Sequence, residues 1–358
     1  MLSWRRVLCD VFQPMNSDSE NTKPPVVWAL IDDRAGNRSQ CLGVADALGL
    51  DYRTQKIGTG PLAKLPNALL GASFAGLNAA TRAGLTPPWP DLVIAAGRRT
   101  APVARKIRRL GGGNVFLAQV MHPGAGAGEF GLIAQPRHDR APHRTGPGLK
   151  ESGDNVHSIT GAPHRLTPER LAEEAERWRG RFDHLPKPWI ALIVGGTTRR
   201  RKFTNPMARE LGARASKMAL LVGGSLLVTT SRRTGAAAEA LIDAVNAPAH
   251  VHRWQDSSQD GGGEDNPYHG YLALANGVIV TGDSVSMCSE ACAGTGPVHI
   301  YAPPALITPK HARLHAGLYE QGYARPLADT ADGFETWSHP RLNPAREVAV
   351  KIRKRLGL

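Results

Sequence analysis

The sequence predicts an α/β protein with two Rossmann-like domains, each built on a parallel sheet. Short apolar runs alternate with stretches of helical spacing along the chain, which is typical of β-α-β units. The alternation stops at Pro186 and Pro188 and restarts at Trp189. The 358 residues are enough for two domains of ordinary size.

The proline pair marks the expected boundary between the domains. We expect a flexible tail over residues 1–24, a first Rossmann-like domain with its linker over 25–186, and a second over 187–335. The last segment, 336–358, contains a basic amphipathic helix that we expect to pack back on the first domain. The predicted strands are 26–31, 91–97, 114–121, 130–134, 189–194, 225–230, 250–254, 277–281 and 298–301, and the predicted helices are 39–48, 100–110, 167–179, 206–221, 236–245, 268–275, 286–293 and 344–356.

The chain is strongly basic. It has 44 Lys and Arg residues against 31 Asp and Glu residues, which gives a net charge of +13. This charge favours an anionic partner, such as a phosphate ester, an acidic membrane surface or nucleic acid, and does not choose among them. Part of it gathers in the first domain, where it suits either anionic lipid or a solvated helix face. These residues are Arg98, Arg99, Arg105, Lys106, Arg108 and Arg109.

Cysteine usage and hydropathy favour a cytoplasmic protein. The four cysteines form no Cys-x-x-Cys pair, which indicates free thiols in a reducing compartment. No apolar run approaches the ~20 residues that span a membrane, and the N-terminal stretch lacks the apolar segment of a secretory signal. We expect a cytoplasmic location, with peripheral binding to the inner face of the cytoplasmic membrane left open.

Polar turns follow four of the predicted strands, at the edge where doubly wound sheets bind ligands. The first turn contains Asp32, Asp33 and Asn37 and lacks the glycine triple of a dinucleotide-binding turn. It also suits an ordinary strand-to-helix turn with polar caps. The first turn therefore points to no particular ligand.

The second turn, Gly195-Gly196-Thr197-Thr198, leads into a basic run that includes Arg200. Glycines let a phosphate approach the backbone, where free N–H groups and basic side chains bind it. A basic run on its own is usually a solvated surface. The turn is a candidate phosphate site on its composition.

The third and fourth turns add hydroxyls, arginines and a carboxylate to the second domain. Ser231 and Arg232 follow one predicted strand and suit either a phosphate or ribose site or a helix cap. Glu290, which we place on the first turn of its helix, could accept ribose hydroxyls or act as a cap. The joint placement of three such turns in one half predicts a phosphate-bearing ligand there. The remaining candidates, at the helix start that favours an anion, are Asp283, Ser284 and Ser286.

Several common sites are excluded. The sequence has no HExxH, EF-hand, Walker A or Gly-x-Ser-x-Gly motif. Tyr52 and Lys56 have the spacing of a short-chain dehydrogenase pair, but no glycine triple precedes them. His138, Asp139 and His143 cluster in a loop, yet a metal site needs more ligands at better spacing. We therefore expect no metal, and the 6% aromatic content argues against an RNA-binding sheet.

Segments spread along the chain resemble the mitochondrial fission ELM family, and we expect a bacterial member of it. The resemblance covers residues 26–323. The segments that carry it are Ile-Asp-Asp-Arg-Ala-Gly-Asn-Arg-Ser-Gln at 31–40, His-Asp-Arg at 138–140, Thr-Gly-Ala at 160–162, Thr-Pro-Glu-Arg at 167–170, Ser-Leu-Leu-Val-Thr-Thr-Ser-Arg-Arg-Thr at 225–234, Asn-Pro-Tyr at 266–268 and Val-Thr-Gly-Asp-Ser-Val-Ser-Met at 280–287.

This family is similar to GT-B glycosyltransferases, in which two Rossmann-like domains face each other across a cleft. Residues 282–297 resemble the nucleotide-binding segment of the lipid-linked GlcNAc transferase of peptidoglycan synthesis. The resemblance implies that Glu290 holds the ribose, that Ser284 and Ser286 hold the diphosphate, and that the glycine turn opens the second domain. It also implies an acceptor side at Asn37 and Gln40.

One departure concerns the acceptor chemistry. That transferase carries a glycine-rich first turn with a histidine, and here residues 32–37 replace it. The resemblance implies a nucleotide-diphosphate-sugar donor as substrate, no cofactor and no metal, and an acceptor in the cell envelope or at the membrane. Asp33, before Asp32, is the candidate base that deprotonates the acceptor hydroxyl.

Three other functions stay open. A nucleotide-sugar epimerase shares this fold and needs no acceptor. A non-catalytic scaffold agrees with the fission role that the family name implies. Nucleic-acid binding rests on charge alone, and we do not expect it.

Overall fold

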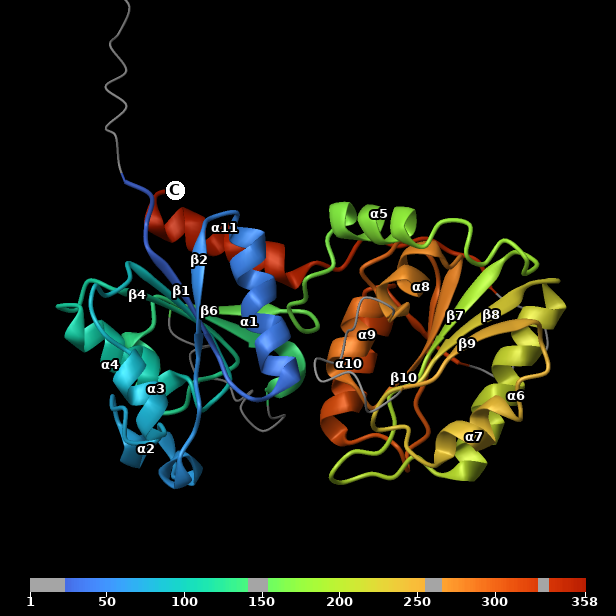
Figure 1. The fold of residues 1–358 in the computed structure, drawn as a ribbon, viewed down its shortest axis with the longest axis horizontal. Helices are drawn as coiled ribbons and strands as arrows, with labels where there is room; N and C mark the ends of the chain where they lie inside the picture. The colour runs from blue at the N-terminus through green and yellow to red at the C-terminus, as the bar shows by residue number, and fades with distance from the viewer. Residues whose placement is uncertain (1–22, 141–153, 255–265, 328–334) are drawn as a thin grey trace, which may run out of the picture.

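The computed structural model describes residues 23–140, 154–254, 266–327 and 335–358, and these form two α/β lobes (Figure 1). Each lobe contains a six-stranded parallel sheet, with strand orders β2-β1-β3-β4-β5-β6 and β12-β11-β10-β7-β8-β9. The prediction of two Rossmann-like domains is confirmed. Of the predicted tail, residues 1–22 lie outside the described part of the chain.

The first sheet has a buried apolar centre and polar edges. The central strands are buried along almost their whole length because their sequences are mostly apolar, with Gln119 and Gln135 as buried polar exceptions. This composition is typical of a parallel sheet covered on both faces. The edge strands are polar and partly exposed, and the sequence did not predict them. The strands are β1 (Val27–Ile31), β2 (Tyr52–Lys56), β3 (Leu92–Ala96), β4 (Phe116–Val120), β5 (Leu132–Pro136) and β6 (Val156–Ile159).

Helices cover both faces of this sheet. Helix α1 (Ala35–Leu48) packs on one face together with the C-terminal helix α11 (Pro344–Leu356). Helix α4 (Ala101–Leu110) covers the other face. Because α1 begins at Ala35, the second half of the predicted turn at 32–37 is its first helical turn. The shorter elements are α2 (Asn67–Leu70), α3 (Ala79–Gly84) and the 3-10 turns η1 (Pro61–Lys64), η2 (Ala127–Glu129) and η3 (Arg137–Asp139).

The second sheet follows the same plan. Helices α6 (Asn205–Leu221) and α7 (Ala237–Ile242) cover one face. Helices α8 (Tyr268–Leu274), α9 (Val285–Ala291) and α10 (Pro309–Glu320) cover the other. The strands are β7 (Trp189–Ile193), β8 (Ser225–Thr229), β9 (Ala249–His252), β10 (Gly277–Thr281), β11 (Val298–Tyr301) and β12 (Arg325–Pro326).

The predicted boundary at residue 186 is wrong. Helix α5 (Pro168–Arg177) packs against α8, and Trp178 and Phe182 belong to the core of the second domain. Phe182 stands edge-on to Trp189 with ring centroids 6.0 Å apart. The prolines at 186 and 188 therefore lie in a loop inside the second domain. The chain passes from the first domain to the second between the end of β6 and Leu166.

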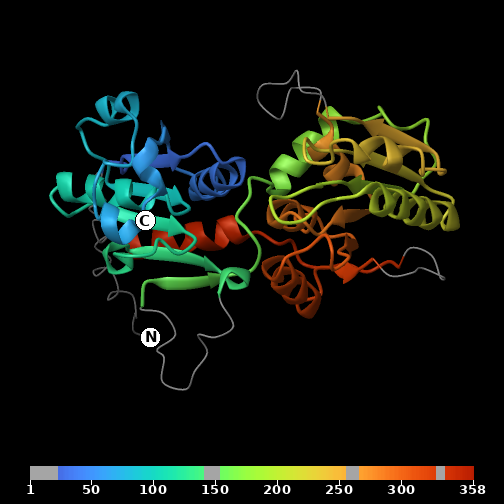
Figure 2. The same ribbon diagram turned by 90° about the horizontal axis from the view of Figure 1, so that it is seen from below.

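The chain crosses back before α11. Leu342 packs in the core of the second domain, whereas Val348 and Ile352 are buried in the core of the first. Figures 1 and 2 both place α11, the red C-terminal helix, beside the first sheet. Two crossing segments therefore join the domains.

Candidate functional site

Both sheets have a topological switch point, where neighbouring strands lead the chain in opposite directions. In the second sheet β7 and β10 are neighbours, and the chain proceeds from β7 to β8 and from β10 to β11. In the first sheet the same holds for β1 and β3. Ligands of doubly wound sheets bind beyond the strand ends at such a point. The predicted turns at Asp32, Gly195 and Asp283 all begin there.

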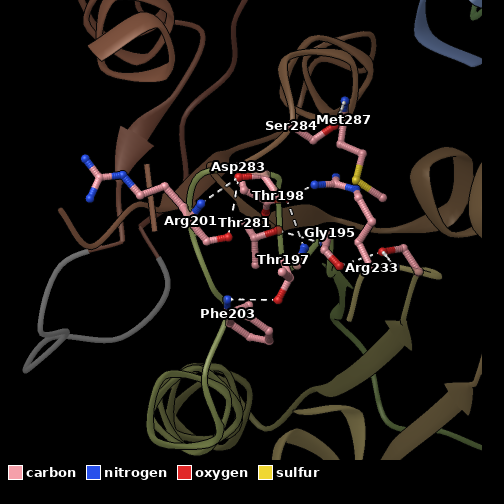
Figure 3. A network of polar contacts seen from close by, with 12 residues as sticks. Gly195, Thr197, Thr198, Arg201, Phe203, Arg233, Thr281, Asp283, Ser284 and Met287 are labelled. Atoms are coloured by element: carbon pink, nitrogen blue, oxygen red, sulfur yellow. Dashed lines mark hydrogen bonds and ion pairs between the residues drawn. The ribbon is translucent and has the colours of Figure 1, made fainter. Parts of the chain in front are cut away.

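Asp283 is the centre of the polar network in the second domain (Figure 3). Its side chain is 0% exposed and forms an ion pair with Arg233. It also accepts a hydrogen bond of 3.0 Å from the N–H of Gly196. A Cβ at Gly195 would lie 2.6 Å from the Asp283 carboxylate, so only glycine fits at that position. Asp283 thus connects the loops that follow β7, β8 and β10.

The backbone N–H groups of the glycine turn already donate hydrogen bonds within the protein. Gly195 N–H donates to Thr281 Oγ1 at 2.7 Å, and Thr197 N–H donates to the Arg233 carbonyl at 2.8 Å. Ser231 Oγ in turn donates to the Gly195 carbonyl at 2.5 Å. The expectation of free N–H groups for a phosphate at Gly195, Gly196 and Thr197 is therefore wrong, because neighbouring loops already satisfy them.

Arg232 is the arginine that the sequence suggested as a site residue, but its neighbour Arg233 is the one that contacts Asp283. The Arg233 side chain is 31% exposed and rests on Asp283, whereas Arg232 and Arg200 are exposed at the surface. The two arginines follow the same strand, so spacing alone did not distinguish them. Arg233 differs from Arg232 by its contact with the carboxylate of Asp283, which lies 50 residues later in the sequence.

The first turn of α9 faces the first domain. Ser284 is the N-cap, and its hydroxyl accepts from Met287 N–H at 3.4 Å. The Ser286 hydroxyl lies 3.7 Å from the position that a Cβ at Gly36 would occupy. Gly36 is in the first turn of α1. The first turns of the helices that begin at the two switch points therefore lie close together between the domains.

Glu290 lies in the last turn of α9, which corrects its predicted place in the first turn. Tyr268 donates its phenolic hydrogen to Glu290 Oε2 at 2.5 Å. Burial raises the pKa of Glu290 to about 7, although this hydrogen bond acts in the opposite direction. The partner tyrosine comes from the Asn-Pro-Tyr segment noted in the sequence, whose role was not predicted.

Asp32 and Asp33, the two candidate bases of the first domain, differ in exposure and in their partners. Asp32 is buried and accepts hydrogen bonds from Asn37 Nδ2 at 2.9 Å and Arg34 N–H at 3.1 Å. Asp33 has a side chain that is 69% exposed, and it pairs with Arg99 at 2.9 Å. The Asp33–Arg99 pair joins the loops after β1 and β3, at the switch point. Asp32 and Asn37 brace the turn, and Asp33 is accessible.

Gln40 lies deeper in the first domain. Its side chain is buried, and its Oε1 has no hydrogen-bond partner within the described residues. Asn37, one turn earlier on α1, would meet a Cβ at Gly97 at 2.4 Å, so it packs closely on the turn after β3. These two predicted acceptor residues therefore lie on one helix, with Asn37 already engaged.

Most of the basic stretch in the first domain is engaged within the domain. Arg98 donates to the Leu65 carbonyl at 2.5 Å and to the Ala63 carbonyl at 2.8 Å. Arg105 is buried and pairs with Glu129, and Arg108 donates to the carbonyl of that residue. Binding to an anionic membrane stays a prediction, and it would depend mainly on Lys106, because Arg109, although exposed, contacts Glu129 at 3.4 Å.

The structure contains no candidate metal cluster and no helix long and apolar enough to cross a membrane, as far as the described ranges extend. His143 lies outside those ranges. His138 is buried, which lowers its pKa to about 4, and its carbonyl accepts from Arg313 Nε at 3.0 Å. Asp139 pairs with Lys310 at 2.5 Å. His138 and Asp139 of the predicted cluster are thus part of a contact between the domains.

A family profile described as "Mitochondrial fission ELM1" matches residues 35–356. The chain belongs to this family. It is 31% identical to mitochondrial fission protein ELM1 of Arabidopsis thaliana over 304 residues, which cover 81% of this chain and 69% of the relative. It is 30% identical to an uncharacterized protein of Rickettsia prowazekii (strain Madrid E) over 352 residues, 91% of this chain and 97% of the relative. The family resemblance predicted from the sequence is confirmed.

The two-domain arrangement is similar to that of solved structures. A UDP-GlcNAc 2-epimerase of Methanocaldococcus jannaschii, in complex with UDP-GlcNAc and UDP, superposes with a TM-score of 0.51 at 12% identity, covering 93% of this chain and 100% of that one. The glycosyltransferase SnogD of Streptomyces nogalater gives 0.46 at 14% identity, over 94% and 95% of the two chains. At such identities the likeness concerns the fold, which is the GT-B-like arrangement of two Rossmann-like domains.

Proposed function

We propose that the chain binds a nucleotide-diphosphate sugar between its domains and transfers the sugar to an acceptor without a metal. The observation that carries the proposal is the meeting of the two switch points, with Ser286 of α9 against Gly36 of α1. A donor bound at one switch point would lie against an acceptor bound at the other. The cell-envelope or membrane-associated acceptor is proposed from the family resemblance.

Arg233 is the proposed ligand of the diphosphate. A guanidinium carries five N–H donors, and one nitrogen suffices for the bond to Asp283. The ion pair fixes the side chain, and its remaining donors can form charge-assisted hydrogen bonds to phosphate. With Ser284 and Ser286 beside it, Arg233 would stabilise the negative charge that develops on the leaving diphosphate.

Glu290 and Tyr268 are the proposed contacts of the nucleoside. They come from α9 and α8 and are joined by a 2.5 Å hydrogen bond. A carboxyl group with a pKa of about 7 is substantially ionised only above neutral pH, where it accepts ribose hydroxyls best. The hydroxyl of Tyr268 holds one carboxylate oxygen and leaves the other for the ligand.

Asp33 is the proposed base on the acceptor side. It is the exposed member of the Asp32–Asp33 pair, and it contacts Arg99 at 2.9 Å. A carboxylate at this place can take the proton of an acceptor hydroxyl as the sugar is transferred. Asn37 and Gln40 remain the proposed acceptor-side residues on α1.

A thermal-shift screen against UDP, GDP, CMP, ADP and their sugar conjugates tests the donor site. A ligand at 100 times its Kd adds about 2.7 kcal/mol to the stability of the folded state. We expect one nucleotide to stabilise the wild-type protein and the Arg232→Gln control, and not Arg233→Gln. No stabilisation by any nucleotide would favour the scaffold function over the transferase.

Product analysis then separates transfer from epimerisation. The fold likeness to a UDP-GlcNAc 2-epimerase makes this second reaction worth testing. An epimerase changes its nucleotide sugar when no acceptor is present, whereas a transferase needs the acceptor. Conversion of the donor alone into an epimer would replace the proposed transfer by epimerisation.

A further inference from the structure

A cavity lies where the chain crosses between the domains. Its volume is about 570 Å³. Its walls come from the end of β6, the two crossing segments, the first two turns of α11, and the ends of α9 and α10 at Ala293 and Gln321. Arg233, Asp283 and Glu290 do not line it. It is therefore separate from the proposed donor site.

The charge of this cavity is strongly positive. Four cationic side chains line it, against a single carboxylate among the lining residues, Glu347. That carboxylate already contacts His157 Nε2 at 2.5 Å. Like charges around one cavity repel each other and attract an anion. The cationic residues are Arg137, Arg341, Arg346 and Lys351.

Three of these cations form no salt bridge. Within the described ranges, no ion pair joins Arg137, Arg346 or Lys351 to a carboxylate, and all three are exposed. Glu169 interacts electrostatically with Arg341 and Arg346 without such a contact. Arg341 donates to the Ala293 carbonyl at 3.2 Å. The cations come from η3, the second crossing segment and α11, so they converge from three separate parts of the chain.

The rest of the lining suits an organic anion. Apolar side chains such as Leu166 and Val350 form part of the wall, beside the polar groups of Ser158 and Tyr323. Pockets of 300–1,000 Å³ with apolar walls and a few convergent polar groups are typical of small-molecule sites. The volume and lining fit a molecule of mononucleotide or sugar-phosphate size better than a bare ion.

We propose that this cavity binds a small phosphate-bearing molecule. Arg346 and Lys351, which lie five residues apart on α11 and project from it in different directions, contact the phosphate from two sides, and Arg137 of η3 closes it from a third. The ligand contacts both domains, because Gln321 of α10 lies in the wall and accepts from Thr160 of the first crossing at 3.1 Å. Its binding therefore fixes the orientation of the domains as well as occupying the cavity.

Calorimetric titration with inorganic pyrophosphate tests this site. The Arg233→Gln variant serves as the background, so that the proposed donor site does not contribute. We expect saturable binding there, and a loss of affinity of at least tenfold when Arg346→Gln and Lys351→Gln are added. The matched control is Lys354→Gln, an exposed cation of the same helix that does not line the cavity.

Each outcome of the titration either supports or overturns the proposed site. Both substituted side chains are exposed, so thermal unfolding without ligand should show that the variants fold like the control. Equal affinities in the double variant and in the Lys354→Gln control would overturn the proposal, as would the absence of saturable binding in the Arg233→Gln background. A failure of the donor-site screen would leave this result unaffected.

Discussion

At the scale of single residues, the second domain depends on how tightly its loops close around the glycine turn. Gly196 has φ = +136°, which side chains with a Cβ rarely adopt. A Cβ there would also lie 2.3 Å from the Arg233 carbonyl oxygen. The backbone of Arg233 therefore contacts the turn from one side while the Asp283 carboxylate contacts it from another. Neither loop can shift without disturbing the Arg233–Asp283 ion pair.

Gly196→Ala should consequently destabilise the protein by about 3 kcal/mol or more, since backbone strain and overpacking each cost about 1–3 kcal/mol. Urea unfolding measures this change. Gly223→Ala is the matched control, because Gly223 has φ = +65° and its Cβ would meet nothing within 4 Å. That control carries strain of about 1–2 kcal/mol without the clash. Equal losses in the two variants would contradict the role of the Arg233 carbonyl.

Glu290 makes stability depend on pH. Its pKa is 4.5 ordinarily and about 7 in the folded state, so between these pH values the folded protein keeps a proton that the unfolded chain has released. As the pH rises from about 4.5 to 7, the contribution of Glu290 to the free energy of unfolding therefore falls by on the order of 3 kcal/mol in total. Above that window the loss is complete.

Urea unfolding at pH 5 and pH 8 tests this prediction. Relative to the wild-type protein, Glu290→Gln should change the difference in unfolding free energy between pH 8 and pH 5 by about 2–3 kcal/mol in favour of pH 8. Buried histidines such as His138, whose pKa is lowered to about 4, act in the opposite direction in both proteins and cancel from this comparison. Glu320→Gln, at an exposed carboxylate on α10, should leave the wild-type difference unchanged. The same pH dependence in Glu290→Gln and in the wild-type protein would show that Glu290 ionises normally.

At the scale of elements, the central strands could be predicted because each is mostly apolar. Of the edge strands, β9 was predicted as 250–254, whereas β2, β6 and β12 were not. β2 has the sequence Tyr-Arg-Thr-Gln-Lys, and β12 has only two residues. Helix α10 was missed although its start repeats a signal used elsewhere, since Thr308 and Pro309 correspond to Thr167 and Pro168 of α5. Its apolar residues were too few to suggest a buried face.

The site was predicted as a set of turns, and its contacts were not. The residue types and the strand ends located Asp283, Ser284 and Ser286. The bond between Asp283 and Gly196 joins residues 87 apart in the sequence, and no local pattern carries that information. For the same reason the sequence suggested Arg232 where the structure selects Arg233.

Helix α11 completes the core of the first domain, far from its other elements in sequence. Ile352 is 0% exposed and packs with residues of α1 and the sheet. Ile352→Ala should therefore cost about 2–5 kcal/mol, through lost burial and the cavity that remains. Val350→Ala on the same helix, at a side chain 56% exposed, should change the free energy of unfolding by about 0.5 kcal/mol or less. Chemical unfolding compares the two, and equal effects would mean that α11 does not share that core.

At the scale of the whole molecule, the domains touch at three kinds of place. The crossing segments are closely packed, since a Cβ at Gly161 would lie 2.8 Å from the Ser289 hydroxyl. The starts of α1 and α9 meet at the switch points. Helix α10 contacts η3, and this contact includes an ion pair of Lys310 with Asp139 and a hydrogen bond from Arg313 to the His138 carbonyl. These two interactions can be removed by substitution without changing the crossing segments or the contact of α1 with α9.

Removing the α10–η3 contact should therefore loosen the domains without unfolding them. The Lys310 side chain is 42% exposed and that of Asp139 17% exposed. An ion pair this near the surface contributes on the order of 1 kcal/mol, so Lys310→Ala with Arg313→Ala should shift an open–closed equilibrium by a few-fold. Small-angle X-ray scattering should show a larger radius of gyration, with thermal stability nearly unchanged. High salt should expand the wild-type protein in the same direction, because it screens the Lys310–Asp139 pair.

The control for this experiment removes an ion pair that lies within one domain. Arg179→Ala deletes the exposed pair with Glu176 and should leave the radius of gyration unchanged. If the double variant scattered like this control, the two crossing segments and the meeting of α1 with α9 would suffice to fix the domains. The donor and acceptor sides would then be held at a constant separation, and a proposed transfer could not depend on closure at α10.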